Sequence, residues 1–294
     1  MRCALIGVTG QLGFDLARTF DLPGELVRLT HADLDLLEPD AAPRVLREVR
    51  PTHVVNAAAY NQVDRAEDER ERAFALNADA VGTLAQTCQA LGATLVHFST
   101  DYVFDGNRTT PYTEDDAPQP LSVYAASKLA GERLAREHCP RAYVIRVCGL
   151  YGVAQSATAG RTNFVETMLR LAGAGQAIRV VRDQVLAPSY TLDIAPKVWR
   201  LLARGGPGLY HLTNAGQTSF YDFAREIFRL SGLAPALTAV TAAEYGARAR
   251  RPPYSVLART RLAALREDDL RPWQPALAAY LRERATRASA PAGC

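Results

Sequence analysis

CALIGVTGQLG, residues 3–13, is an apolar run that passes directly into three glycines and then into a helical pattern. The run predicts a buried strand over Cys3–Val8, and Gly7, Gly10 and Gly13 mark a tight turn into a helix. Glycines in such a turn let the backbone approach a pyrophosphate, which the N–H groups and the positive end of the helix then hold. The GxxGxxG spacing therefore predicts a dinucleotide site. A glycine-rich turn that holds no ligand remains the alternative.

Further β-rich runs follow in the first half of the chain, and a helical pattern separates each run from the next. Such alternation predicts a parallel sheet with crossover helices. Runs such as LVHF and YVIRV are continuously apolar, as in strands that are covered on both faces. We therefore expect an α/β fold with a Rossmann-type doubly wound parallel sheet. The expected strands are Cys3–Val8, Leu26–Leu29, His53–Asn56, Thr94–Phe98 and Tyr143–Val147.

After Gly152 the alternation loosens into a polar stretch of small residues, Val153–Thr162, which predicts a loop. We expect residues 1–152 to form a nucleotide-binding domain and residues 153–294 to form mainly a smaller α/β substrate domain. Residues 285–294 are typical of a frayed tail. The later helices are expected at Phe164–Ala172, Ile194–Ala203, Tyr221–Leu230 and Pro275–Arg284, with short extended runs at Ile178–Val181 and Leu209–Leu212.

The bulk composition excludes several classes of partner. The chain has 294 residues, and its formal net charge of +3 comes from 34 basic and 31 acidic residues without a basic block. We therefore expect no nucleic-acid groove. The five cysteines form no metal-ligand or redox pattern and are typical of reduced cytosolic thiols. No apolar stretch reaches the roughly 18 residues of a membrane span, and the N-terminal run is too short for a signal peptide. We expect a cytoplasmic protein with no metal site and no membrane partner.

Arg28, Thr30 and His31 stand where the second expected strand ends, a position at which a carboxylate commonly binds the adenosine ribose. We expect no carboxylate at the end of this strand, so no negative charge would repel the 2′-phosphate of NADPH. Arg28 would lie close to that phosphate. The pattern favours NADPH, with NADH as the alternative and a solvated Arg28 as the simpler interpretation. A little later, Asp35 is either a hydrogen-bond acceptor for the adenine amino group or an exposed loop acid.

Tyr124 and Lys128 lie four residues apart in the helical pattern YAASK, so their side chains share one face. A tyrosine hydroxyl, with an ordinary pKa of about 10, becomes an acid–base group near neutral pH when an ammonium stabilises its phenolate. Thr100 follows the strand LVHF, at the carboxyl end where open sheets bind ligands. The three residues predict a catalytic set in which Thr100 orients a carbonyl. An amphipathic helix with a half-buried tyrosine and a snorkelling lysine is the alternative.

Lysine is rare in this chain. Only two of the 34 basic residues are lysines, Lys128 and Lys197, and the other 32 are arginines. A lysine in the YxxxK pattern suits a site that needs a compact ammonium with a tunable pKa. Chance placement is the alternative.

Between Gly7 and Trp273 the chain carries, in order, NAAAYNQVDRAE, FALNADAVGTLA, LVHFSTDYVFDG, PLSVYAASKLAGE, NFVETMLRLA, DQVLAPSY, GLYHLTNAGQTS and RRPPYSVL. Together with the glycine turn, these segments resemble the dTDP-4-dehydrorhamnose reductase family of extended short-chain dehydrogenases. The resemblance implies hydride transfer from NADPH to the C4 ketone of dTDP-4-dehydro-L-rhamnose, which gives dTDP-L-rhamnose. The implied partner is thus a nucleotide sugar.

The resemblance also implies a role for individual residues. Tyr124 is the implied proton donor, Lys128 its electrostatic and ribose-binding partner, and Thr100 the hydroxyl that polarises the ketone. The residues implied to line the cofactor are Gly7, Gly10, Gln11, Leu12, Gly13, Asp35, Leu36, Ala59, Tyr60, Asn61, Asn77 and Phe98, beside Tyr124 and Lys128. Those implied to face the sugar nucleotide are Thr100, Asp101, Asn163, Gln184 and Arg251. An arginine suits the diphosphate.

In the family, a segment around residues 185–215 is implied to return to the first domain, which makes the second domain discontinuous. A homodimer is left open. Two departures concern the sugar: Cys148-Gly149 stands where the family commonly has a serine–tryptophan pair, whose ring would stack on the substrate. The loop Val153–Thr162 is also longer than usual, where a substrate lid would lie.

Three alternatives remain. The first is a reductase of another nucleotide-linked 4-ketosugar. The second is a dehydratase or epimerase with the same fold and Tyr–Lys pair, but a dehydratase typically uses two adjacent carboxylic acids, and here Asp101 is followed by Tyr102. The third is a non-catalytic subunit that resembles the regulatory subunit of methionine adenosyltransferase, which would bind NADPH without consuming it.

Overall fold

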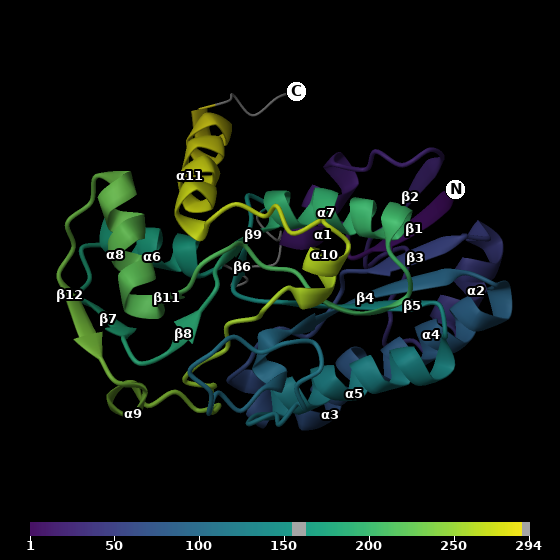
Figure 1. Cartoon of the computed structure of the whole chain (residues 1–294), viewed down its shortest axis with the longest axis horizontal. Helices are drawn as coiled ribbons and strands as arrows, with labels where there is room; N and C mark the ends of the chain where they lie inside the picture. Colours follow the sequence, from purple (N-terminus) through teal and green to yellow (C-terminus); the bar gives the residue numbers. More distant parts are fainter. Residues whose placement is uncertain (155–162, 290–294) are drawn as a thin grey trace.

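The structure is a computed structural model that describes residues 1–154 and 163–289 (Figure 1). The larger part of the molecule is a six-stranded sheet with helices on both faces, and a smaller part lies at one end of this sheet, on the left in Figure 1. The expected loop at Val153–Thr162 lies outside the described residues from residue 155 onward.

The sheet has the order β10-β5-β4-β3-β1-β2, and all of its neighbouring strands are parallel. Its strands are β1 (Arg2–Ile6), β2 (Glu25–Leu29), β3 (His53–Asn56), β4 (Thr94–Thr100), β5 (Ala142–Val147) and β10 (Gly208–His211). From β1 the chain moves outward to β2 and then crosses to β3 on the other side, so a topological switch point lies between β1 and β3. This confirms the doubly wound α/β fold. The expected strands differ from these by at most two residues at each end.

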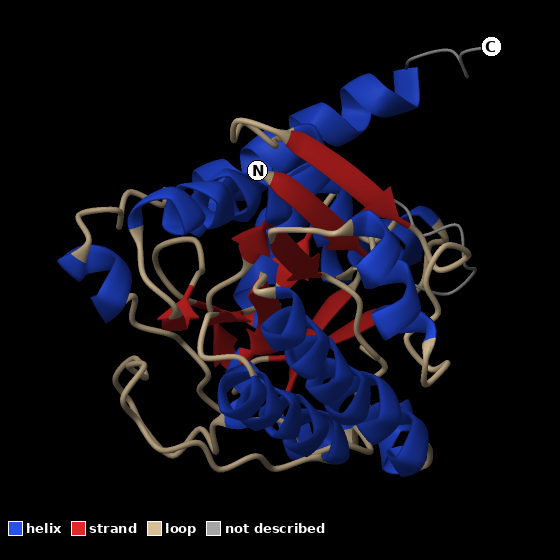
Figure 2. Cartoon of the chain, turned by 90° about the vertical axis from the view of Figure 1, so that its right-hand side faces the viewer, coloured by secondary structure: helices blue, strands red, loops and turns tan. Residues whose placement is uncertain are grey.

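Helices cover both faces of the sheet (Figure 2), and an apolar layer lies under the helices on each side. On one face, α2 (Ala41–Val49), α4 (Ala80–Leu91) and α5 (Val123–His138) pack against strand residues such as Val54 and Leu95. On the other face, α1 (Gln11–Arg18) and α7 (Thr191–Arg204) pack against strand residues that include Leu5 and Val96. Burial on both sides explains why these strands are continuously apolar.

The smaller part is built around its own core of aromatic residues, which includes Tyr151, Phe223 and Tyr280. Its helices are α6 (Phe164–Gly173), α8 (Phe220–Ser231), α9 (Ala242–Tyr245) and α11 (Trp273–Ser289). Its strand pairs are β7 (Ile178–Val181) with β12 (Leu237–Val240), β8 (Val185–Leu186) with β11 (Thr218–Ser219), and β6 (Leu150–Tyr151) with β9 (Ser189–Tyr190). The remaining helical segments of the described chain are α3 (Arg70–Phe74), α10 (Thr260–Ala264), the π-helical Ala75–Asp79, and the 3₁₀ turns Arg65–Glu67 and Asp101–Val103.

The chain crosses between the two parts more than once. Helix α7 packs on α1, where the indole Nε1 of Trp199 donates to the Leu16 carbonyl at 3.2 Å, and β10 then pairs with β5. Strand β8, at the start of the segment expected to return, pairs with β11 instead. Leu262 of α10 and Leu270 also join the layer around α1 and α7. The return to the sheet is therefore made by α7, β10 and α10.

Helix α11 is longer than the sequence indicates. It continues to Ser289, so the prediction that the frayed tail starts at residue 285 was wrong for residues 285–289, and residues 290–294 lie outside the described chain. Ion pairs join this helix to both parts of the molecule: Arg284 binds Glu166 of α6, and Glu283 binds Arg18 of α1 at 2.6 Å. Within the described ranges, no helix is long and apolar enough to cross a membrane.

Candidate active site

The glycine-rich turn packs tightly against the residues that follow β3. Gly7 has a φ of +80°, and a Cβ on it would lie 2.8 Å from the backbone nitrogen of Ala58. A Cβ on Gly13 would lie 2.1 Å from the Gly7 oxygen, so α1 packs this closely on the turn only without a side chain there. A Cβ on Gly10 would meet its first neighbour at 3.4 Å, an ordinary contact. Glycine at position 10 is thus not required by the fold, and it keeps the backbone open to a phosphate.

The N-terminus of α1 offers several backbone donors. Gly10 is the N-cap, and the first intrahelical hydrogen bond runs from the Phe14 nitrogen to the Gly10 oxygen at 2.8 Å. The N–H groups of Gln11, Leu12 and Gly13 consequently have no partner inside the helix. Three such donors and the positive end of the helix dipole suit a pyrophosphate. The turn and the helix start therefore fit a dinucleotide.

Asn77 holds the segment that follows β3. The Tyr60 nitrogen donates to its Oδ1 at 2.9 Å, and its Nδ2 donates to the Tyr60 oxygen at 3.0 Å and to the Ser127 hydroxyl at 3.0 Å. The Ser127 hydroxyl in turn donates to the Tyr124 carbonyl at 2.8 Å. Asn77 thus fixes Ala59, Tyr60 and Asn61 at the switch point, and it ties them to the first turn of α5. Ala59 is half-buried and Asn61 is exposed.

Lys128 lies on the buried face of α5, with only 3% of its surface exposed. Its ammonium donates to the Phe98 carbonyl at 2.6 Å, while the Phe98 ring packs on the opposite face of the sheet. Burial lowers the pKa of Lys128 to about 8, and the Glu132 carboxylate, one turn further along α5, opposes this. The Lys128 ammonium is thus buried with a lowered pKa, and its role in the site stays a prediction.

Tyr124 stands in the first turn of α5, because the Ser122 side chain caps this helix by accepting from the Ala125 nitrogen at 3.3 Å. Burial raises the pKa of Tyr124 to about 12, and a hydrogen bond with Thr100 partly offsets this effect. The prediction that the Lys128 ammonium brings the tyrosine pKa down was wrong for this state of the chain. That ammonium is bonded to the Phe98 carbonyl, and desolvation of the buried ring dominates.

Thr100 ends β4 and lies between Tyr124 and Asp101. Its hydroxyl donates to the Asp101 carboxylate at 3.1 Å and accepts from the Tyr102 nitrogen at 3.2 Å. The Tyr102 ring meets the Tyr124 ring edge to face, with centroids 6.2 Å apart. Asp101 is 3% exposed, and it also accepts from the Cys148 thiol at 3.0 Å. Thr100 and Tyr124 are therefore brought together at the end of β4, with Lys128 one turn further along α5, and their catalytic role stays a prediction.

The adenosine side of the turn differs from expectation. Arg28 is exposed on β2, as the simpler interpretation has it. Asp33 folds back so that its carboxylate accepts from the Thr30 nitrogen at 2.8 Å and from the Thr30 hydroxyl at 2.7 Å. The prediction that no acid stands where β2 ends was therefore wrong, because the turn brings back a residue three positions later.

Asp35 lies close to this turn. Its side chain is 36% exposed and accepts from the Leu37 nitrogen at 2.9 Å, and Leu36 beside it is buried. Asp35 lines a hollow of about 420 Å³ with His31, Asp33 and Arg44. The segment that is implied to meet the adenine thus borders a cavity.

Asn163 joins the start of α6 to the start of α1. It caps α6 by accepting from the Glu166 nitrogen at 2.9 Å, and its Nδ2 donates to the Gln11 side chain at 3.3 Å and to the Gly152 carbonyl at 3.2 Å. Gln184 is buried between β7 and β8, and its carbonyl accepts from the Phe220 nitrogen at 3.2 Å.

The Arg251 guanidinium is paired with a carboxylate. Its guanidinium binds both carboxylate oxygens of Asp64, at 3.0 and 2.7 Å, and also the Ala249 carbonyl at 3.0 Å. It also hydrogen-bonds Tyr102. Asp64 lies shortly after the segment held by Asn77, so this ion pair joins two segments that are 187 positions apart in the sequence.

Two polar residues near the site were missed by reasoning from the sequence. Glu132 binds Arg146 through two hydrogen bonds of 2.9 and 2.7 Å, and both side chains are buried. The same i, i+4 spacing that joins Tyr124 to Lys128 predicts Glu132 on that face. Ser255, which hydrogen-bonds Asp101, carries no sequence signal, since only folding brings it there.

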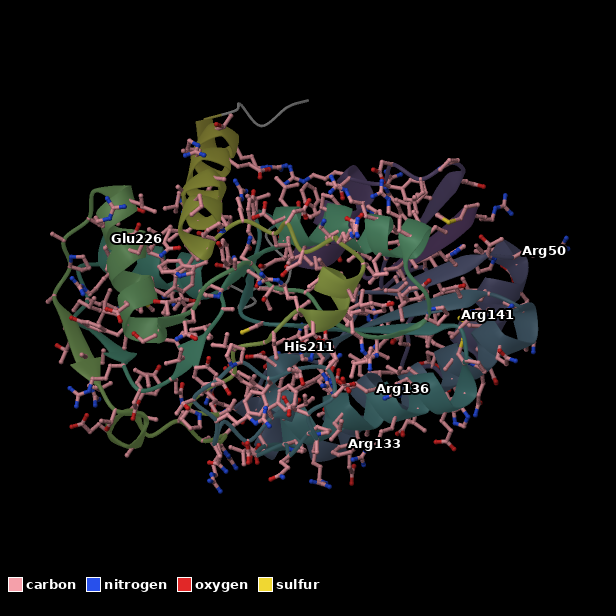
Figure 3. The ribbon with its side chains drawn as sticks, in the orientation of Figure 1. Arg50, Arg133, Arg136, Arg141, His211 and Glu226 are labelled. Carbon is pink, nitrogen blue, oxygen red and sulfur yellow. The ribbon has the colours of Figure 1, made fainter. Side chains whose placement is uncertain are left out.

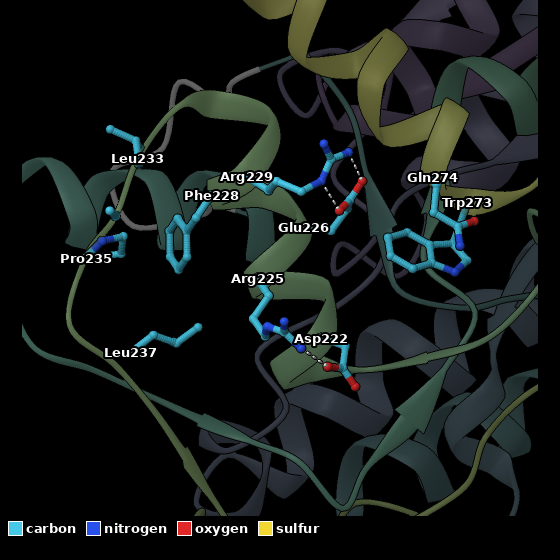
Figure 4. A pocket seen from close by; sticks show the side chains of 11 residues that line it. Asp222, Arg225, Glu226, Phe228, Arg229, Leu233, Pro235, Leu237, Trp273 and Gln274 are labelled. Atoms are coloured by element: carbon cyan, nitrogen blue, oxygen red, sulfur yellow. Dashed lines mark hydrogen bonds and ion pairs between the residues drawn. The ribbon is translucent and has the colours of Figure 1, made fainter.

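A second hollow lies away from these residues, along α8 (Figure 4). It has a volume of about 570 Å³ and is bordered by Phe228 and Trp273. The charged side chains that line it pair with each other: Arg229 binds Glu226 at 2.7 Å and Arg225 binds Asp222 at 3.3 Å. It contains no residue of the candidate site.

Comparison with known proteins places this geometry in a family. The family model described as the RmlD substrate binding domain matches residues 1–286. The chain is 40% identical over 284 residues to the dTDP-4-dehydrorhamnose reductase of Streptomyces griseus, which covers 94% of this chain and 91% of that protein. It is 39% identical over 281 residues to a Streptomyces antibioticus protein named "Probable dTDP-4,6-dihydroxy-2-methyloxan-3-one 4-ketoreductase", with coverage of 94% and 93%.

A solved structure gives the same result. The dTDP-4-dehydrorhamnose reductase of Bacillus anthracis str. Ames, crystallised in complex with NADP, superposes with a TM-score of 0.90. The two chains are 34% identical, and the match covers 96% of this chain and 99% of that one.

Proposed function

The chain belongs to the RmlD substrate-binding family, and on that premise we propose that it is an NADPH-dependent reductase of a nucleotide-linked sugar. The proposed reaction reduces the C4 ketone of dTDP-4-dehydro-L-rhamnose to the alcohol, which gives dTDP-L-rhamnose. The relatives named dTDP-4-dehydrorhamnose reductase support this proposal, as does the NADP complex of the Bacillus anthracis protein.

One observation carries the proposal. The hydroxyls of Thr100 and Tyr124 meet in a buried site at the carboxyl end of β4, one helical turn from Lys128. When bound, NADPH supplies the hydride. The glycine turn and the free N–H groups at the start of α1 would hold its pyrophosphate, and Asn77 would fix the segment beside it. One of the three ammonium donors of Lys128 goes to the Phe98 carbonyl, and the others would bind the ribose hydroxyls.

Tyr124 is suited to donate the proton. Because burial raises its pKa to about 12, its hydroxyl is protonated at neutral pH, which is the form that a reductase requires. The hydroxyl gives its proton to the ketone oxygen as negative charge develops there. Thr100 donates a hydrogen bond to the same oxygen and stabilises that charge.

The sugar itself has a second candidate, another nucleotide-linked 4-ketosugar. Gly149 has a φ of +50°, and a Cβ on it would lie 2.8 Å from Cδ1 of Leu186. An aromatic side chain at this position would therefore need a strained backbone and a moved Leu186. The relative named as a different 4-ketoreductase favours this candidate.

Elimination chemistry is less well supported than reduction, since Tyr102 follows Asp101 where a dehydratase would typically have a second acid. The regulatory-subunit alternative predicts NADPH binding without turnover. We further propose that residues 1–152, with α7, β10 and α10, form the cofactor-binding unit, and that the remaining segments bind the sugar nucleotide. A cytoplasmic location and a homodimer remain predictions.

The proposal is tested by following NADPH oxidation with enzymatically prepared dTDP-4-dehydro-L-rhamnose. Wild type is expected to turn over, and Tyr124→Phe is expected to lose at least about 100-fold in kcat, because general acid catalysis contributes that much. The matched control is Tyr143→Phe, which removes a buried hydroxyl that donates to Gly205 at 3.0 Å, away from the site. Binding of NADPH without turnover of this sugar or of any other 4-ketosugar would support the regulatory subunit instead.

A further inference from the structure

Asp101 forms a carboxyl bridge between a catalytic hydroxyl and a thiol. One of its oxygens accepts from the Thr100 hydroxyl at 3.1 Å, and the other accepts from the Cys148 thiol at 3.0 Å. The exposed fractions of Thr100, Asp101 and Cys148 are 6%, 3% and 1%. Ser255, itself 2% exposed, adds a hydroxyl from the substrate part. The bridge joins the ends of β4 and β5 directly under the candidate active site.

The Thr100 hydroxyl has one hydrogen and two lone pairs. One lone pair already accepts from the Tyr102 nitrogen at 3.2 Å. When Asp101 is ionised, its carboxylate takes the hydrogen of Thr100, and the remaining lone pair can only accept, which draws the Tyr124 hydroxyl toward Thr100. In that arrangement neither hydroxyl offers its hydrogen to a ketone.

A neutral Asp101 reverses the direction of these hydrogen bonds. Its own O–H donates to the free lone pair of Thr100, so the Thr100 hydrogen is released toward the substrate. The Tyr124 hydrogen is then released as well, because Thr100 has no lone pair left to accept it. Both donors that the proposed reduction needs become available without any movement of heavy atoms.

We propose that Asp101 acts as a neutral acid that aims the Thr100 and Tyr124 hydrogens at the ketone, and that Cys148 is a positioning residue that helps to keep it neutral. The inference rests on the proposed function, since it assigns the protonation state of that same site. A thiol is a weaker hydrogen-bond donor than a hydroxyl and therefore stabilises the ionised carboxylate less. Cysteine in place of serine thus favours the neutral acid.

The surroundings of Asp101 shift its carboxyl toward the neutral form, although with a pKa of about 6 that form is the minor one at pH 7 in the free chain. Burial raises its pKa to about 6, although the hydrogen bonds from Ser255, Cys148 and Thr100 lower it. Burial also raises the pKa of Cys148, Tyr102 and Tyr124, so these three groups are neutral at pH 7. Arg251 bonds Tyr102, and its charge is matched by Asp64. NADPH and sugar would bury the carboxyl further and raise its pKa again.

The inference is tested first without turnover, by ¹³C NMR of protein labelled at the aspartate carboxyl carbons, with Asp101→Asn to assign the signal. We expect a midpoint near pH 6 in wild type. Cys148→Ser supplies a stronger donor and is expected to lower this midpoint, and Cys148→Ala removes the donor and is expected to raise it. Cys139→Ser, a buried thiol that contacts Ala93 instead, is the matched control and should leave it unchanged. A wild-type midpoint near the ordinary aspartate value of about 4, unmoved in both Cys148 variants, would overturn the inference.

The second test is the pH profile of kcat/KM, which reports the groups of the free enzyme. Between pH 5.5 and pH 7.0 the neutral fraction of a group with a pKa of about 6 falls about 8-fold, and wild-type kcat/KM is expected to fall with it. Asp101→Asn cannot ionise, so this fall should be absent in the variant, whatever its absolute rate. An equal fall in wild type and variant would overturn the inference. If the NMR midpoints behave as expected but no 4-ketosugar is reduced, the proposed function fails and the bridge stands.

Discussion

Three glycine-to-alanine substitutions separate what the glycine turn does for the fold from what it does for the cofactor. In Gly13→Ala the new methyl group would lie 2.1 Å from the Gly7 oxygen, against 3.4 Å for the ordinary contact at Gly10. Because the obstacle is backbone, α1 has to shift by about 1 Å, and overpacking of this kind costs roughly 1–3 kcal/mol or more. We expect Gly13→Ala to lose about 3 kcal/mol of unfolding free energy and to bind NADPH poorly.

Gly10→Ala should behave differently. In the chain without cofactor its methyl group would meet no atom closer than the Gly7 oxygen at 3.4 Å, so the unfolding free energy should change by less than about 1 kcal/mol. The methyl group would stand where the pyrophosphate approaches the backbone, so NADPH affinity should fall at least about tenfold. Gly173→Ala, at the end of α6 with no atom within 4 Å, is the matched control. It should be neutral or slightly stabilising and should bind NADPH normally.

The assays are urea unfolding and titration of NADPH fluorescence. Equal losses of stability in Gly10→Ala and Gly13→Ala would refute the steric argument, because the two methyl groups meet different surroundings. Normal NADPH affinity in Gly10→Ala would refute the assignment of the pyrophosphate to this turn.

Two further predictions concern charges. Burial holds the pKa of Lys128 at about 8 in the folded chain, below the 10.5 of a free lysine. Between these values the unfolded chain binds more protons, so stability rises with pH across that window. Relative to Lys128→Met, wild type should gain about 1 kcal/mol of unfolding free energy from pH 8 to pH 9, and a difference in unfolding free energy that does not change with pH would contradict the buried ammonium. Asp64→Asn should lower the Kd for dTDP several-fold because it frees Arg251 for the diphosphate, whereas Arg251→Gln should raise this Kd. If calorimetry shows a higher Kd in both variants, the ion pair has a structural role and does not hold Arg251 back from the diphosphate.

The sequence predicts the sheet well because parallel strands buried on both faces are continuously apolar, a signal that depends on few distant contacts. His53–Asn56 and Ile178–Val181 are strands with the expected limits. The end of α11 was missed because Arg287 lies over the Phe14 ring, 4.9 Å from its centroid, and polar tail residues carry no trace of such a distant partner. Asp33 was missed for a local reason: an aspartate three residues beyond Thr30 turns back to accept from it, and strand periodicity does not describe that turn.

The candidate site divides in the same way. Spacing on one helix brings Tyr124 and Lys128 to one face, and the register of β4 places Thr100 beside them. The protonation states do not follow from spacing, because they depend on burial that only the folded chain creates. Thus the sequence indicates a lysine that lowers the tyrosine pKa, whereas in the fold Lys128 bonds the Phe98 carbonyl and Tyr124 is desolvated.

The lysine count also takes a different meaning from the structure. Both lysines are buried. Lys128 lies on the inner face of α5, and Lys197 lies on α7, where it binds Glu267 at 3.1 Å and also Asp269. The arginines Arg133 and Arg136 stand on the solvent side of α5, as Figure 3 shows. Both lysines are thus buried ammonium groups, whereas arginine is used on the surface and also, at Arg146, in a buried ion pair. Since Lys197 lies outside the candidate site, the scarcity of lysine indicates a buried ammonium and not catalysis, and the case for Lys128 as a catalytic residue rests on its distance to Phe98 and its place one turn after Tyr124.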